Sequence, residues 1–234
     1  MTFRPDDRVY VDESKVRGYY VVATASAISD VRASERALRD LLKPGQRRLH
    51  FKSESDSRRR QILSRMCALD VRVSVWLVRQ RSDKEARPLS LAALTEDAVL
   101  GGVAKLVIER DASLERADRR LIAETIRRVG PAEMQYLHVA PHEHPLLWVS
   151  DAVAWCYSNG GDWVRRVEAL VGPRVTRMEK HVSLARHTVR KTARLRGLLP
   201  AVLPVYSAHG RAKAEPASLR GTTKPPEGSG GFML

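Results

Sequence analysis

The chain has 234 residues, with 41 lysines and arginines against 27 acidic residues, so its formal charge is +14. This length allows one sizeable hydrophobic core with an appendage, or two small domains. The basic excess favours a polyanionic partner such as nucleic acid or an anionic membrane surface. No apolar run approaches the roughly 20 residues of a membrane span, and the first five residues do not open a signal peptide.

The two cysteines, Cys67 and Cys156, lie far apart in stretches that predict helices. They show neither the spacing of a disulfide framework nor that of a CxxC metal knuckle. We therefore expect both thiols to be reduced and the protein to be cytoplasmic.

The charge is concentrated toward the C-terminus. From Arg174 onward, twelve lysines and arginines stand against three glutamates. The Gly-Pro pair at 172–173 is a break signal. We therefore expect a body at residues 1–172, a basic amphipathic helix at 173–199, and a basic tail at 200–234 whose Pro, Gly and Ser content predicts disorder.

The first expected element is a strand at residues 8–14 that ends in two carboxylates. Period-two alternation puts Asp12 on the face of Tyr10 and Glu13 on the opposite face. Burial of an unpaired carboxylate costs several kcal/mol, so such a group is usually paired, neutralised or given a metal. Taken alone, this stretch is equally compatible with a site residue and with a carboxylate that caps the following loop.

The next elements alternate, which favours an α/β fold. In chain order we expect a strand at residues 18–25 that pairs with the first as a hairpin, a helix at 33–42, a short extended segment at 48–52, a helix from the polar caps at 53–56 to about 69, a strand at 71–78 and a helix at 89–104.

A second pair of acids closes the strand expected at residues 105–111, where period two places Glu109 and Asp111 on one face. A helix at 114–129 and a strand at 134–139 follow. In the helix after Pro145, Asp151 projects from an otherwise apolar face, which carboxylates rarely occupy without a partner. A metal, an arginine or a backbone amide could be that partner.

Three short motifs and their order along the chain point to a known family. They are Tyr10-Val11-Asp12-Glu13-Ser14, then Leu49-His50-Phe51-Lys52, then Pro145-Leu146-Leu147-Trp148-Val149-Ser150-Asp151-Ala152. Over residues 7–170 they resemble a largely uncharacterised bacterial and phage family of ribonuclease-H-like proteins. Its members open with a Tyr-x-Asp-Glu-Ser-Gly strand, carry an x-His-Phe segment near residue fifty and close with a Leu-Gln-x-Ala-Asp helix.

The resemblance implies an α/β fold with a ribonuclease-H-like mixed sheet flanked by helices. It also implies a nuclease that hydrolyses phosphodiester bonds of DNA or RNA with Mg²⁺ or Mn²⁺ held by carboxylates. In that scheme the roles fall as follows: Asp12 bridges two metals, Glu109 or Asp111 and Asp151 each anchor one, and His50 or Glu54 orients the water or protonates the leaving group. The expected partner is nucleic acid, with no membrane, and a homodimer is left open.

The sequence departs from the family pattern at several positions, so a second hypothesis about its function remains. Lys15 replaces the glycine after Asp-Glu-Ser, Arg48 stands where a glutamate is common, and Trp148 and Ser150 replace Gln and Ala beside the last Asp. The alternative is a non-catalytic nucleic-acid-binding or assembly protein that retains the fold. An arginine filling the centre of the site would favour it.

Two other patterns are interpreted as structural. His138, His142 and His144 lack a downstream ligand pattern, so we expect solvated side chains rather than a transition-metal site. The pair at 101–102 is no phosphate loop, because the GxxxxGK[ST] spacing is missing.

Overall fold

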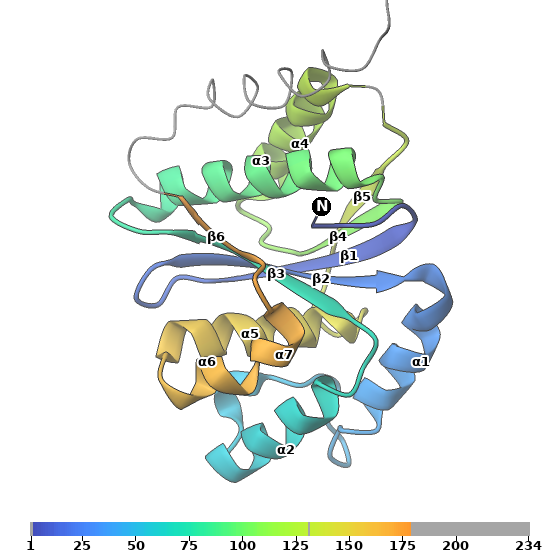
Figure 1. Ribbon diagram of the computed structural model, residues 1–234, viewed down its shortest axis with the longest axis vertical. Coiled ribbons are helices and arrows are strands. Elements are labelled where there is room, and N and C mark those ends of the chain that lie inside the picture. The colour runs from blue at the N-terminus through green and yellow to red at the C-terminus, as the bar shows by residue number, and fades with distance from the viewer. Residues whose placement is uncertain (1, 131, 179–234) are drawn as a thin grey trace, which may run out of the picture. The chain divides into compact units, whose positions relative to one another are not determined.

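The computed structural model describes residues 2–130 and 132–178, which form a mixed sheet between two layers of helices (Figure 1). The strands are β1 (Asp7–Ser14), β2 (Tyr19–Ala27), β3 (Arg72–Val78), β4 (Lys105–Glu109), β5 (Gln135–Val139) and β6 (Val175–Met178). The helices are α1 (Ile28–Arg39), the 3₁₀ turn η1 (Phe51–Ser53), α2 (Asp56–Met66), α3 (Asp83–Gly101), α4 (Glu115–Val129), α5 (Leu146–Asn159), α6 (Asp162–Arg166) and α7 (Glu168–Val171).

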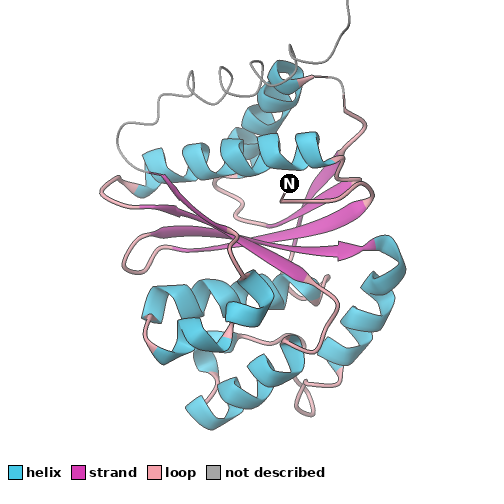
Figure 2. Ribbon diagram, viewed as in Figure 1, coloured by secondary structure: helices cyan, strands magenta, loops and turns pink. Residues whose placement is uncertain are grey.

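The strand order is β5-β4-β1-β2-β3-β6. β1, β2 and β3 form an antiparallel meander, whereas β4 runs parallel to β1, β5 parallel to β4 and β6 parallel to β3. The mixed sheet flanked by helices that the sequence predicts is therefore confirmed (Figure 2). Because β1 and β4 run in the same direction, the acids near their C-terminal ends lie at one edge of the sheet.

Each face of the sheet has its own hydrophobic core. α3 and α4 cover one face, and α1, α2, α5 and α7 cover the other (Figure 1). Val9 and Val11 of β1 belong to the first core, and Tyr10 belongs to the second. The alternation expected for β1 therefore separates two environments along a single strand.

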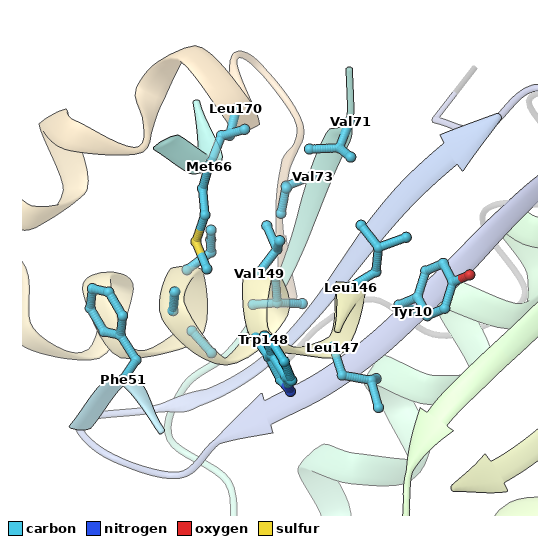
Figure 3. Close-up of a cluster of buried hydrophobic side chains, with 14 of the residues drawn as sticks. Tyr10, Phe51, Met66, Val71, Val73, Leu146, Leu147, Trp148, Val149 and Leu170 are labelled. Atoms are coloured by element: carbon cyan, nitrogen blue, oxygen red, sulfur yellow. The ribbon is translucent and has the colours of Figure 1, made fainter. Parts of the chain in front are cut away.

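Helix α5 is the central element of the second layer. Leu146, Leu147 and Val149 are fully buried and belong to one cluster with Tyr10 of β1 (Figure 3). Within that layer, the Ser150 hydroxyl donates to the carbonyl of Tyr10 over 2.8 Å and lies 2.8 Å from the Thr24 hydroxyl. These buried bonds fix the rotation of α5 against β1, and so they fix where the next residue, Asp151, points.

Helix α3 begins six residues before its expected start. Ser82 and Glu85 form a capping box, in which the Ser82 amide donates to the Glu85 carboxylate over 3.1 Å. Pro88 lies inside the first turns of the helix, directly before the expected start at residue 89. The cap and the burial of Ala86 outweigh the one backbone bond that the proline removes.

The prediction of an amphipathic helix at residues 173–199 is wrong for its first residues. Val175–Met178 is strand β6, which pairs with β3 from Val75↔Val175 to Val78↔Met178. The physical reason is that the free edge of β3 offers backbone donors and acceptors to this β-branched segment. The rest of that helix and the tail at 200–234 lie outside the described residues.

The turn between β1 and β2 forms without strain at Lys15. The left-handed φ angles of this turn are at Arg17 (58°) and Gly18 (138°). Lys15 in the family's glycine position is therefore compatible with the hairpin. Among the described residues, no helix is both long and apolar enough to cross a membrane.

Candidate active site

An open pocket of about 800 Å³ lies where β1, β4 and α5 come together. Its acidic and imidazole lining comprises Asp12, Glu13, His50, Glu109, Asp111 and Asp151. We call it the carboxylate pocket. It collects acids that are as much as 139 positions apart in the sequence, so only the tertiary fold could assemble it.

Asp12 and Glu109 come from neighbouring parallel strands. The register pairs Tyr10 with Val107 and Val11 with Ile108, so Asp12 lies beside Glu109 one step further along. Both project from the face of the sheet that Tyr10 and Val107 occupy. Two carboxylates therefore face the same pocket from adjacent strands.

Asp151 reaches the pocket from α5. One of its oxygens, Oδ2, accepts a hydrogen bond from the amide of Phe51 over 3.1 Å. This backbone donor belongs to η1, so the motif around residue fifty and the motif around residue 150 meet at this bond. A backbone amide is one of the partners that the sequence left open for Asp151, and it occupies one of the two carboxylate oxygens.

The three carboxylates oppose one another electrostatically. Burial raises the pKa of Asp12 well above its usual value, and the charges of Glu109 and Asp151 raise it further. Burial and then the charge of Asp151 raise the pKa of Glu109. Burial likewise raises the pKa of Asp151, although the Phe51 amide opposes this shift. Like charges near one another in a partly desolvated site favour protonation or a bound cation.

The donor set has the right chemistry for a hard divalent cation, because all three groups offer carboxylate oxygens. The arrangement is not that of a completed site. Within residues 2–130 and 132–178, no three His, Cys, Asp or Glu side chains are placed to hold a metal ion as they stand. Cation binding would therefore require the carboxylates to turn toward a common point.

The remaining predicted site residues differ in placement. His50 lines the carboxylate pocket, and its electrostatic interaction with Asp151 lowers the pKa of that carboxyl. Glu54 does not line the pocket, since its buried carboxylate binds Lys43 over 2.6 Å and Gln46 over 3.2 Å. The structure therefore brings His50 to the site and leaves Glu54 outside it.

Asp111 lies at the margin of the pocket. Strand β4 ends at Glu109, so the period-two argument that aligned Asp111 with Glu109 does not extend to it. Its carboxylate accepts bonds from the amide and hydroxyl of Ser113 over 3.0 and 2.6 Å, and these bonds lower its pKa. Glu109 is thus the acid of this pair that shares the environment of Asp12 and Asp151.

An arginine borders the pocket. Arg48 Nη1 lies 3.8 Å from Glu109 Oε1, with the Arg48 side chain 38% exposed. The distance is that of an ion pair without a hydrogen bond, and its charge lowers the pKa of Glu109 against the larger raising effects. Arg48 partly neutralises one of the three acids from the solvent side.

The η1 segment is held in place by Arg59. Its guanidinium donates to the carbonyl of Phe51 over 3.0 Å and to that of Lys52 over 2.6 Å. It also lies 4.3 Å from the centre of the Trp155 ring, which lines the carboxylate pocket. Arg59 therefore fixes the backbone that presents the Phe51 amide to Asp151.

Glu13 enters a different network on the opposite face of the sheet. Its carboxylate binds Arg87, Tyr19 and Lys15. Arg87 also forms a bidentate pair with Asp118, with N–O distances of 3.0 and 2.7 Å. We call Glu13, Tyr19, Arg87, Asp118 and His138 the paired network.

The paired network corrects the expectation that His138 is solvated. His138 is 3% exposed, and its Nε2 lies 3.2 Å from Asp118 Oδ2. Burial alone would raise the pKa of Asp118, but the bonds to His138 and Arg87 lower it overall. Sequence reasoning missed Arg87 and Asp118. The available signal was Asp118 at helical spacing from buried Ile122 and Thr125, because a carboxylate on a buried helix face needs a partner.

The mixed α/β sheet flanked by helices is confirmed. It opens with a hairpin and brings acids from its first strand, its fourth strand and a late helix to one pocket. The narrower ribonuclease-H-like assignment stays a prediction.

Among solved structures, the chain is similar to one described as the PCNA:RNase HII complex from Archaeoglobus fulgidus. The two share 16% identity with a TM-score of 0.46, and the match covers 83% of this chain and 91% of that one. No protein-family model and no curated protein matches the sequence. The narrower family resemblance therefore stays a prediction.

Proposed function

We propose that this protein is a divalent-metal-dependent nuclease that hydrolyses phosphodiester bonds of DNA or RNA in the carboxylate pocket. The observation that carries the proposal is the meeting of Asp12, Glu109 and Asp151 in one open pocket, with pKa values raised by burial and by one another. A protein gains nothing in stability from such an arrangement without a cation. Strained electrostatics of this kind cluster at functional sites.

Each acid of the carboxylate pocket has its own role in this proposal. Asp12 would be shared by two cations, since the charges of both other acids raise its pKa, and Glu109 and Asp151 would each hold one. When bound, Mg²⁺ or Mn²⁺ supplies an activated water and stabilises the leaving oxygen. The Phe51 amide orients Asp151 by holding its Oδ2.

Two residues at the pocket wall complete the proposal. His50 is exposed and lines the pocket, so its imidazole can orient a water or give a proton to the leaving oxygen. Lys52 is exposed beside it and can meet a substrate phosphate. Glu54, which lies outside the pocket, has no part in this scheme.

The test compares Asp151→Asn with Glu54→Gln in cleavage of labelled DNA and RNA with Mg²⁺ or Mn²⁺. We expect Asp151→Asn to abolish metal-dependent cleavage and Glu54→Gln to retain it, since the latter changes an acid of the same layer away from the pocket. Thermal unfolding with added metal provides a second readout. A cation bound only by the folded state should raise the unfolding temperature of the wild type and not of Asp151→Asn. Cleavage by Asp151→Asn at the wild-type rate would overturn the proposal.

The second candidate function is nucleic-acid binding without chemistry. The observation that favours it is Arg48, whose guanidinium lies beside Glu109 among residues not yet arranged as a metal site. Under this alternative the wild type binds nucleic acid, shows no metal-dependent cleavage, and unfolds at the same temperature with and without Mg²⁺ or Mn²⁺.

A further inference from the structure

A second surface hollow, of about 560 Å³, lies between the β1–β2 turn and the β3–α3 turn. Four of its lining residues are cationic, namely Lys15, Arg17, Arg79 and Arg81, against one acid, Asp83. We call it the basic cleft. Cations at this density create a positive potential that attracts anions from solution.

The sheet register brings these cations together. β2 and β3 pair antiparallel up to Tyr19↔Val78, so the residues before Tyr19 and those after Val78 leave the sheet side by side. Arg17 and Gln80 both have left-handed φ angles, of 58° and 60°, which turn the chain sharply on each side. Arg17 and Arg79 therefore converge through the fold although they are far apart in the sequence.

Local partners neutralise only part of this charge, since Arg81 lies 4.0 Å from Glu85. The Arg17 guanidinium donates to the carbonyl of Asn159 over 3.3 Å, which satisfies a donor but adds no negative charge. Lys15 lies 3.1 Å from Glu13, a carboxylate that Arg87 already binds. Arg79 lines the cleft and is exposed. A net positive charge therefore remains for an external anion.

The basic cleft and the carboxylate pocket adjoin at Lys15, which lines both hollows. A chain with phosphates at regular intervals that passes Lys15 would therefore meet both. The pocket repels phosphate unless cations are bound, whereas the cleft attracts it unaided. We infer that the basic cleft binds backbone phosphates of a nucleic-acid strand on one side of the bond that the carboxylate pocket would cut. This inference rests on the proposed function and adds to it the direction in which the substrate leaves the site.

The test is equilibrium binding of fluorescent single-stranded and duplex oligonucleotides, without divalent metal, over a series of NaCl concentrations. The double variant Arg17→Gln/Arg79→Gln removes two cations of the cleft. The matched control Arg32→Gln/Arg36→Gln removes the same charge from exposed positions on α1, outside the lining of both hollows. Unfolding temperatures show whether each variant is folded, and Arg79→Gln alone serves as the milder change.

We expect the cleft variant to bind all sequences more weakly, because phosphate contacts carry no base information. The slope of log K against log salt should become shallower by about 0.7–0.9 for each phosphate that the variant no longer neutralises. The control variant should keep nearly the wild-type slope. A folded cleft variant with the affinity and slope of a binding-competent wild type would overturn the inference and leave the proposed function standing. A wild type that binds no nucleic acid would overturn both.

Discussion

Asp12 and Glu13 are consecutive residues, yet the sheet gives them opposite electrostatic environments. Glu13 faces α3 and α4, where Arg87, Tyr19 and Lys15 bind its carboxylate. Asp12 faces α5, where the charges of the acids Glu109 and Asp151 raise its pKa. One face thus compensates its buried charges within the protein, whereas on the other face the carboxylates oppose one another and only Glu109 has an arginine, Arg48, beside it. This difference separates a structural ion cluster from a candidate site better than the presence of acids does.

The largest effect should come from breaking the paired network with Arg87→Ala. This change leaves Asp118 buried without its bidentate partner and Glu13 without its main cation. Removal of one partner of a buried ion pair typically costs about 3–5 kcal/mol. Urea unfolding should show this loss, while Arg127→Ala, at an exposed position of the adjacent helix α4, should change stability little. A loss no greater than that of the control would mean that the network contributes little to stability.

A substitution at Asp12 should raise the stability of the protein, whereas Arg87→Ala should lower it. Because its neighbours raise its pKa, Asp12→Asn should stabilise the metal-free protein at neutral pH, by about 0.5–2 kcal/mol, the usual range for single stabilising substitutions. The folded state keeps the Asp12 proton at pH values where the unfolded chain has lost it. Ionisation of Asp12 therefore costs stability as the pH rises through the raised pKa.

The advantage of Asp12→Asn should accordingly be small near pH 3, where Asp12 is largely protonated in both states, and should grow toward neutral pH. Paired urea titrations of wild type and variant across this range measure it, with the exposed Asp70→Asn as control. A variant that is less stable than the wild type at pH 7, or a difference that does not change with pH, would contradict the repulsion inferred for the pocket.

The smallest effect should come from Arg48→Ala. Arg48 is a solvent-side partner of Glu109 at 3.8 Å, and such exposed pairs are worth about 0.2–1 kcal/mol. The change should lower stability by less than this upper value and should tighten Mg²⁺ or Mn²⁺ binding, because a competing cation leaves Glu109. Isothermal titration with metal checks the second effect. Weaker metal binding in Arg48→Ala would show that Arg48 supports the site rather than competes for it.

Several features could be predicted because they depend on local periodicity. The alternation in residues 8–14 placed Asp12 and Glu13 on opposite faces, and the helical spacing around Asp151 marked a carboxylate on an apolar face. Other predictions were wrong for equally local reasons. The alternation at residues 105–111 was extended past the end of β4, so Asp111 was grouped with Glu109. The capping box at Ser82 and Glu85 was a helix start signal in the sequence, six residues before the start that we predicted.

The sequence by itself determined the types of the strands and α-helices from β1 to α5, the α/β class and the face on which each acid of β1 would lie, because these follow from the two-residue period of a strand and the 3.6-residue period of a helix. Only the tertiary structure decided which charges meet. The parallel register of β1 and β4 places Asp12 beside Glu109. The packing of α3 against α4 brings the Arg87 guanidinium within hydrogen-bonding distance of the Asp118 carboxylate. Glu54 binds Lys43 and does not line the carboxylate pocket. Residues 175–178 form an edge strand instead of the predicted helix. Each of these outcomes depends on contacts between distant segments, for which local periodicity carries no information.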